Sequence, residues 1–130
     1  MIVDASVAFK WLIEEEGTIA ALDLLGQPLA APTLVYSEVG NALWRKQRRG
    51  ELGADDLNDL PGQLSTLVNV VDETRLIGRA LAMACLLDHP TYDCVYLAMA
   101  ETYQRPLITA DKRFLRRVAS SEWKEMVREL

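Results

Sequence analysis

The sequence has few cysteines, a single histidine and no long apolar run. Its 2 cysteines and 1 histidine are too scattered for the ligand pattern of a zinc site. No apolar run approaches the ~20 residues that a membrane-spanning helix needs, and no basic and apolar leader precedes the first predicted strand. Cys85 and Cys94 lie in apolar helical patterns, so we expect both to be buried free thiols in a reducing compartment. A cytoplasmic protein with no membrane association is therefore expected.

The chain also lacks the excess of positive charge that is typical of nucleic-acid-binding proteins, because its net charge is −5. The basic residues nevertheless cluster within 45–49 and within 112–117. Local clusters attract an anionic ligand even where the total charge is negative. For each residue taken singly, a solvated helix face is the alternative. The candidates for phosphate contacts are Arg45, Arg48, Arg49, Lys112, Arg113 and Arg116.

Predicted strands alternate with predicted helices along the chain. The strands are short apolar segments at 1–6, 29–31, 68–71 and 107–109. The helical patterns lie at 7–12, 18–25, 33–49, 53–67, 72–87, 92–103 and 111–117. This alternation predicts an α/β fold in which helices cover both faces of a parallel sheet. The length is that of a single domain, which we expect to span residues 1–130.

Residues with strong local preferences mark several element boundaries. Asp72 and Thr91 are expected to cap the helices that follow them, because their side chains accept hydrogen bonds from free backbone N–H groups. Pro61 is expected to break or kink helix 53–67. The tail 120–130 fits either a fifth strand around Met126-Val127 or a last helix.

Two aspartates follow predicted strands that are far apart in the sequence. Asp4 ends the first strand, and Asp111 comes shortly after the strand at 107–109. If these strands lie parallel in one sheet, their carboxyl ends share an edge, where open α/β sheets usually carry their sites. Taken singly, each aspartate is more simply explained as a helix cap.

Two further acids interrupt apolar helical patterns. Glu38 lies on or beside the apolar stripe of helix 33–49, and an unpaired ionised carboxylate is costly to bury. A buried arginine partner is the alternative for Glu38. Asp93 lies in the first turn of the most apolar helix, where the helix dipole offers a second explanation. All four acids can converge on the same sheet edge as Asp4 and Asp111.

Clustered carboxylates repel one another unless a cation lies among them. Ligands that are all oxygen suit Mg²⁺ or Mn²⁺, so the predicted metal ligands and catalytic residues are Asp4, Glu38, Asp93 and Asp111. A site of this kind activates water and stabilises the transition state of phosphodiester hydrolysis. Ser6 and Thr109 are placed to hydrogen-bond the carboxylates, although strand-end or capping hydroxyls explain them equally well.

Several segments of the chain together resemble the PIN domain and, more narrowly, the VapC-type toxins of bacterial and archaeal toxin–antitoxin pairs. The match covers nearly the whole chain in order and spacing. The segments that carry it are Asp4-Ala5-Ser6, Lys10-Trp11-Leu12, Glu38, Tyr92-Asp93-Cys94-Val95-Tyr96-Leu97-Ala98-Met99-Ala100 and Leu107-Ile108-Thr109-Ala110-Asp111-Lys112-Arg113-Phe114.

The resemblance implies a Rossmann-like α/β/α sandwich with a central parallel sheet. It implies a Mg²⁺- or Mn²⁺-dependent endoribonuclease that cuts structured RNA such as tRNA or rRNA. The matching acids are Asp4, Glu38, Asp93 and Asp111, with Asp4 and Asp93 as the foremost direct ligands. A homodimer silenced by a cognate antitoxin is also implied. Cys94 stands where a small residue is usual, and segment 53–66 matches nothing diagnostic.

Other functions fit the sequence less well. A non-catalytic PIN-like module that binds RNA or protein gains nothing from clustered, mutually repelling acids. A phosphatase of the haloacid-dehalogenase type needs a second aspartate two residues after Asp4, where this chain has Ser6. A response-regulator receiver needs an acidic pair at the first strand, which this chain lacks. It also needs a phosphoacceptor aspartate after the third strand, where Val71-Asp72 leads into a helix.

Overall fold

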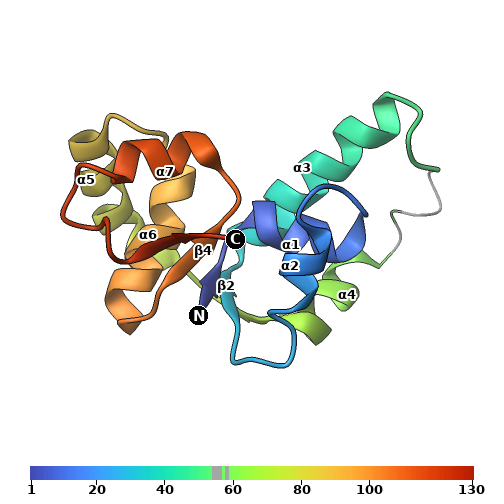
Figure 1. Cartoon of the computed structure of the whole chain (residues 1–130), viewed down its shortest axis with the longest axis horizontal. Helices are drawn as coiled ribbons and strands as arrows, with labels where there is room; N and C mark the ends of the chain where they lie inside the picture. Colours follow the sequence, from blue (N-terminus) through green and yellow to red (C-terminus); the bar gives the residue numbers. More distant parts are fainter. Residues whose placement is uncertain (54–56, 58) are drawn as a thin grey trace.

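The computed structural model describes residues 1–53, 57 and 59–130, and it contains one parallel sheet with helices on both sides (Figure 1). The sheet is 5-stranded with the order β3-β2-β1-β4-β5, and every neighbouring pair is parallel. The strands are β1 (Ile2–Val3), β2 (Ala30–Pro32), β3 (Asn69–Val71), β4 (Leu107–Thr109) and β5 (Val127–Glu129). The predicted three-layer α/β/α architecture is confirmed.

Two groups of helices cover the two faces of the sheet (Figure 1). One face carries α1 (Ala5–Leu12), α2 (Thr18–Leu22), α3 (Leu34–Arg48) and α4 (Leu60–Leu67). The other carries α5 (Ile77–Leu87), α6 (Thr91–Tyr103) and α7 (Lys112–Val118). The short 3₁₀ helix η2 (Thr74–Leu76) leads into α5. No helix in the described residues is long and apolar enough to cross a membrane.

Alternate residues of the central strands fill two separate cores. Ile2 and Leu107 pack with α5, α6 and α7, whereas Val3 and Ile108 pack with the helices of the other face. This alternation follows from the two-residue period of a strand, which turns successive side chains to opposite faces. Helix α6 is buried along its whole middle, from Cys94 to Ala100, as its nearly uniform apolar sequence predicts.

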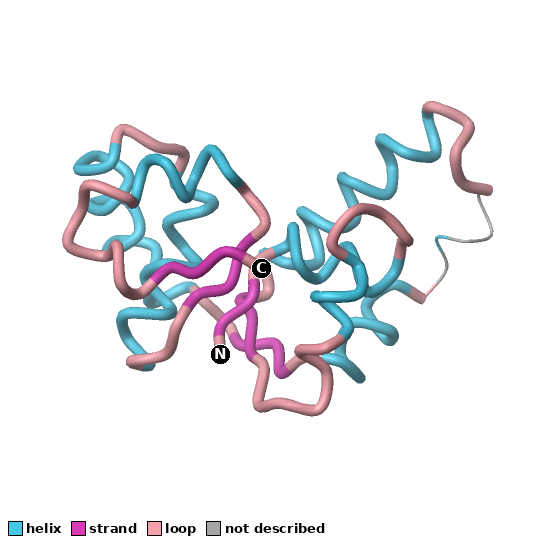
Figure 2. The backbone as a smooth tube through the Cα atoms, viewed as in Figure 1, coloured by secondary structure: helices cyan, strands magenta, loops and turns pink. Residues whose placement is uncertain are grey.

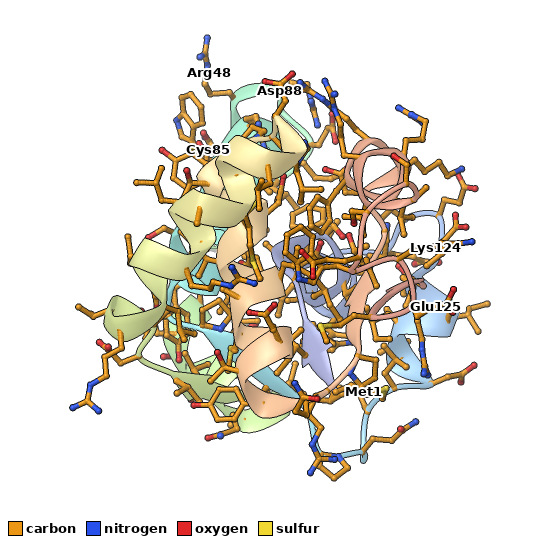
Figure 3. The ribbon with its side chains drawn as sticks, turned by 90° about the vertical axis from the view of Figure 1, so that its left-hand side faces the viewer. Met1, Arg48, Cys85, Asp88, Lys124 and Glu125 are labelled. Atoms are coloured by element: carbon orange, nitrogen blue, oxygen red, sulfur yellow. The ribbon has the colours of Figure 1, made fainter. Side chains whose placement is uncertain are left out.

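The strand order changes direction at β1, and this change places the site. The chain runs from β1 outward to β2 and β3, then returns to add β4 and β5 on the other side (Figure 2). Helices leave β1 and β4 toward opposite faces, which opens a crevice at their carboxyl ends. Figure 3 shows Met1 at one end of the molecule and Arg48 and Asp88 at the other.

Several boundary predictions are wrong. Helix α5 follows η2, and Asp72 accepts from the Thr74 N–H instead of capping α5, at 2.9 Å. Pro90 precedes α6 at the cap position, so Thr91 is already helical. Helix α4 begins at Leu60 with Pro61 in its first turn, where proline is tolerated, and the predicted helix at 54–56 and 58 lies outside the described residues. For the tail, where the sequence fits either a strand or a last helix, the structure has the strand β5, which extends the sheet beside β4.

The two cysteines differ from each other in exposure. Cys94 is buried in α6, as predicted, but Cys85 is exposed. Cys85 lies on the outer face of α5, whose buried residues are Ala80, Met83, Ala84 and Leu87. The apolar pattern of this helix continues onto its outer face, so burial of every apolar residue was the wrong expectation.

Candidate active site

Asp4 follows β1 directly and caps α1 from a buried position. Its side chain is fixed by three donors: Oδ1 accepts from the Ser6 hydroxyl at 2.6 Å and the Val7 N–H at 3.1 Å. Oδ2 accepts from the Thr109 hydroxyl at 2.5 Å. With 6% of its surface exposed, Asp4 is one of few buried charged residues in the described chain. Asp4 therefore caps α1, and the three hydrogen bonds together hold its carboxylate rigidly.

The hydroxyls of Ser6 and Thr109 join the two central strands at their carboxyl ends. The Ser6 oxygen, which donates to Asp4, accepts from the Ala110 N–H at 2.8 Å. The Thr109 oxygen accepts from the Asp111 N–H at 2.9 Å. Each hydroxyl is thus both donor and acceptor, and together they tie Asp4 to the loop after β4.

Asp111 caps α7 and keeps one oxygen for the crevice. Its Oδ1 accepts from the backbone N–H groups of Arg113 at 2.7 Å and Phe114 at 3.1 Å. For Oδ2, the described part of the chain provides no donor. The arrangement again combines a cap with a carboxylate at the sheet edge.

Glu38 lies in the second turn of α3 and is only partly buried. Its Oε2 accepts from the Tyr96 hydroxyl at 2.6 Å, across the crevice between α3 and α6. Among the described residues, no arginine or lysine forms an ion pair with Glu38, so the buried-arginine explanation is wrong. Oε1 has no donor within that same set of residues.

Asp93 lies in the first turn of α6, and its partner is His89 from the preceding turn. The distance from His89 Nε2 to Asp93 Oδ2 is 2.5 Å. Oδ1 of Asp93 has no donor within the described chain. Asp93, Glu38 and Asp111 therefore each present one free carboxylate oxygen.

All four predicted acids line a single cleft of about 400 Å³ at the carboxyl edge of the sheet. The residues that line it come from α1 and α3, and from α6 and the loop before α7. Figure 1 shows α1 and α3 on one side of the sheet and α6 and α7 on the other. The other residues that line it are Ala5, Ser6, Phe9, Lys10, Glu15, Ala42, Arg45 and Ala110. Four elements distant in sequence thus contribute carboxylates to one space.

Burial raises the pKa values of Asp4, Glu38 and Asp93, and repulsion between the carboxylates adds to the shift. Burial raises the pKa of Asp4 to about 6, although the hydrogen bonds from Ser6, Thr109 and Val7 oppose the shift. Burial, with a smaller contribution from the charges of Asp93 and Asp4, raises the pKa of Glu38 to about 7. The pKa of Asp93 is also raised by burial, and the His89 hydrogen bond offsets part of the shift. A positive charge among these groups would reverse all three shifts.

The donor set fits a hard divalent cation. Within the described residues, no three histidine, cysteine or acidic side chains are already drawn together as in a formed metal site. The free oxygens of Glu38, Asp93 and Asp111 nevertheless belong to side chains that line one cleft. Mg²⁺ keeps several waters and needs few direct protein ligands, so this set of carboxylate oxygens suits it.

The predicted basic residues lie around the cleft in two groups. Arg45 lines the cleft and, with Arg48 and Arg49, an adjoining hollow of about 250 Å³ on α3. Lys112 lines a second neighbouring hollow, which shares Lys10 with the cleft. Two further residues of the set, Arg113 and Arg116, are exposed on α7. The Arg49 guanidinium is engaged with Glu51 at 2.6 Å, so it is less available than Arg45.

The sequence did not predict the contacts of three side chains near the cleft. Tyr96 lies one helical turn after Asp93, a spacing that places both on one face of α6, but its bond to Glu38 spans 58 residues. His89 precedes Asp93 by four residues, but this spacing predicts a contact only if the turn at Pro90 brings the two side chains together. Lys10 reaches Glu15 at 2.6 Å beside the cleft. Of the three contacts, only that of Tyr96 joins distant segments, and the other two lie within a loop or turn of the chain.

The family model of the PIN domain matches residues 1–120 of this chain. The chain belongs to the PIN domain family. Ribonuclease VapC3 of Pyrobaculum aerophilum is 29% identical to this PIN domain over 118 residues, which cover 87% of this chain and 90% of the relative. The resemblance to VapC-type proteins is thereby confirmed.

Two solved structures share the fold of this PIN domain. PAE2754 from Pyrobaculum aerophilum superposes with a TM-score of 0.71 at 21% identity, covering 98% of this chain and 87% of its own. A toxin–antitoxin complex from Klebsiella pneumoniae gives a TM-score of 0.70 at 17% identity, with 98% and 94% covered. At these identities the likeness concerns the fold alone.

Proposed function

We propose that this PIN domain is a divalent-metal-dependent endoribonuclease and the toxin of a toxin–antitoxin pair. The observation that carries the proposal is the cleft at the carboxyl edge, where Asp4, Glu38, Asp93 and Asp111 meet. The 29% identity to a VapC ribonuclease over most of both chains supports the same activity. A module that only binds RNA or protein has no use for buried acids that repel one another.

Asp4, Glu38, Asp93 and Asp111 would hold Mg²⁺ or Mn²⁺ in the cleft. When bound, the cation supplies Lewis-acid polarisation of the scissile phosphate and activates water for in-line attack. Asp4 contributes rigidity, since three hydrogen bonds fix its carboxylate before any ligand arrives. Glu38 retains a proton up to about pH 7 without the cation, so loading of the site releases protons.

The basic residues around the cleft would bind the RNA backbone. Arg45 lies on the cleft wall, close enough to contact a phosphate next to the scissile bond. The hollow formed with Arg48 and Arg49 extends the positive surface along α3, and Lys112, Arg113 and Arg116 extend it along α7. Such contacts supply affinity without sequence information, so a structured RNA such as tRNA or rRNA would be chosen by its shape.

A cognate antitoxin protein would be the partner of this chain in a cytoplasmic toxin–antitoxin pair. The solved toxin–antitoxin complex from Klebsiella pneumoniae covers 98% of the fold and supports the assignment. A homodimer would use α3 and α5, which expose large apolar side chains to solvent. Leu81 on α5 is 55% exposed and Trp44 on α3 is 48% exposed. Light scattering on the purified protein would show a mass of two chains.

The direct test is cleavage of bulk tRNA and rRNA by the purified protein with Mg²⁺ or Mn²⁺, followed by mapping of the new RNA ends. The expected result is cuts at few positions with 5′-phosphate ends, and no cutting in the presence of EDTA. Induction in cells should arrest growth, and the same ends should appear in cellular RNA. Binding of RNA without cutting under every metal condition would favour the non-catalytic module and refute the proposed activity.

A further inference from the structure

His89 is the only histidine of the chain, and its ring contacts Asp93, one of the residues that line the cleft. Its side chain is 2% exposed and lies in the turn between α5 and α6. One edge of the ring contacts Asp93, with 2.5 Å between Nε2 and Oδ2. Phe114 of α7 packs against the ring, with centroids 5.1 Å apart and a 37° angle between the planes. The ring therefore has one polar contact and an aromatic wall.

The second ring nitrogen shows which tautomer is present. His89 Nδ1 is buried and has no hydrogen-bond partner among the described residues. A proton on Nδ1 would be a buried donor without an acceptor, which is costly, whereas a proton on Nε2 is donated to a carboxylate. The bonding pattern thus places a proton on Nε2, which donates it to Asp93 Oδ2.

We propose that His89 is a positioning residue for the metal site, which holds Asp93 so that its Oδ1 faces the cleft. The proposal rests on the proposed metal-dependent activity. With Oδ2 tied to His89, rotation of the carboxylate would break a short hydrogen bond to a buried donor. Oδ1 is then the free oxygen on the cleft side. Partners that orient a metal ligand typically change metal affinity about 10- to 100-fold when removed.

A purely structural role makes a different prediction from the same contacts. In that case the bond to Asp93 would serve only to pin the turn between the two helices of this face. Removing His89 would lower thermal stability, and the affinity of the folded protein for a cation would stay unchanged. Metal affinity measured on folded protein therefore separates positioning from structural support.

Three variants make this separation. His89→Leu removes the donor and keeps an apolar side chain against Phe114. His89→Gln keeps a donor, because the amide nitrogen of glutamine reaches about as far as Nε2. Val118→Ala is the matched control: Val118 lies in the same core and is 2% exposed, and its truncation loosens this face without touching a polar group.

The measurement is isothermal titration of MnCl₂ into each folded variant without RNA, together with the melting temperature of the apo protein. His89→Leu should weaken Mn²⁺ binding at least about tenfold. His89→Gln should stay within about threefold of the wild type, and Val118→Ala should keep wild-type affinity even where its melting temperature falls more. Wild-type affinity in His89→Leu, or an equal loss in His89→Leu and His89→Gln, would overturn the positioning role.

Kinetics provide the second readout. If His89 acts through Asp93, His89→Leu should need more Mn²⁺ for half-maximal RNA cleavage and should regain most of its kcat at saturating Mn²⁺. A loss of kcat that extra Mn²⁺ does not restore would contradict positioning. Failure of the underlying activity is recognisable separately, because the wild type would then neither bind Mn²⁺ in the titration nor cut RNA.

Discussion

The two ends of the sheet carry hollows of similar size and opposite chemistry. At the carboxyl edge, a cleft of about 400 Å³ is lined by Asp4, Glu38, Asp93 and Asp111. At the amino edge, a hollow of about 450 Å³ is lined mainly by apolar groups. These are Met1, Ile2, Pro28, Leu29, Ala30, Val71 and Met99, with Asn69, Tyr103 and Arg105. Volume alone therefore does not distinguish a site from a packing gap.

The difference follows from the parallel direction of the strands. Every strand of this sheet ends at the same edge, and the residues that follow β1 and β4 also begin helices there. Side chains such as Asp4 and Asp111 can therefore cap a helix and still face the crevice between the two helical layers. At the amino edge the chain enters the strands, so within the described residues no strand leads into a helix there that a carboxylate could cap.

The largest effect is expected when charge is removed from the carboxyl edge, because the contrast between the two edges rests on that charge. Asp4→Asn and Asp93→Asn should each lower single-turnover RNA cleavage in Mn²⁺ at least about 10³-fold, because a cation loses a charged ligand worth several kcal/mol. Asp72→Asn is the matched control, since Asp72 follows β3 at the same edge but is exposed and does not line the cleft. Wild-type cleavage by either cleft variant would show that these acids only cap helices.

The reverse experiment alters the amino edge. Met99 is 1% exposed and lines the apolar hollow, so Met99→Ala should lower the free energy of unfolding in urea by about 2–5 kcal/mol. Mn²⁺ affinity of the folded protein should not change, because no group at that edge contacts the cleft. Loss of Mn²⁺ binding in a folded Met99→Ala protein would mean that the two edges are coupled.

The fold could largely be predicted from the sequence, because local patterns determine it. The apolar segments around Ile2 and Leu107 predict strands of a parallel sheet, and the structure pairs them directly. The even apolar character of 94–100 predicts the central position of α6. The convergence of Asp4 and Asp111 follows from the same topology. Their capping bonds, which the sequence offers as an alternative, coexist with their position on the cleft.

The remaining features depend on contacts between distant segments. The bond from Tyr96 to Glu38 joins residues 58 positions apart, and no local pattern reports it. Thr109 was expected to hydrogen-bond a carboxylate, but its pairing with Asp4, 105 positions away, is visible only in the structure. The start of α4 was missed because Pro61 fits a first turn as well as a kink. The exposure of Cys85 was missed because an apolar helical pattern does not show which of its faces is left uncovered.

The pH dependence of stability tests the charge of the buried acids at the carboxyl edge. The pKa of Asp4 is raised to about 6 in the folded state, so the folded chain binds this proton more tightly than the unfolded chain. The Asp4 proton contributes its full stabilisation to the folded state below about pH 4. This contribution, about 2–3 kcal/mol in the free energy of unfolding, is lost as the pH rises through the folded pKa. Urea unfolding of metal-free protein should therefore give lower stability at pH 8 than at pH 5.

The raised pKa of Glu38, about 7, extends the same loss toward neutral pH. Saturating Mn²⁺ at pH 8 should restore the lost stability, because the cation favours the ionised carboxylates. In metal-free buffer, Asp4→Asn should make the free energy of unfolding depend less on pH. Stability that rises between pH 5 and pH 8 in the metal-free wild type would contradict the repulsion inferred for the cleft.

The smallest expected effect concerns RNA binding at the two edges. Arg45→Ala should weaken RNA binding several-fold at moderate salt and lower the slope of log K against log salt by about one contact, without moving the cut position. Arg105→Ala is the matched control, because Arg105 lies at the amino-edge hollow. Equal losses from both variants in filter binding across a salt series would show that charge anywhere on the surface suffices.

The most direct test is diffraction from Mn²⁺-soaked crystals, measured for the anomalous signal of manganese. The predicted result is a peak inside the cleft, within ligand distance of Asp4 or Asp93 and near Glu38 and Asp111. At an Mn²⁺ concentration that supports RNA cleavage, a cleft without a peak would contradict the assignment of these carboxylates to a cation. A peak confined to another surface would contradict it equally.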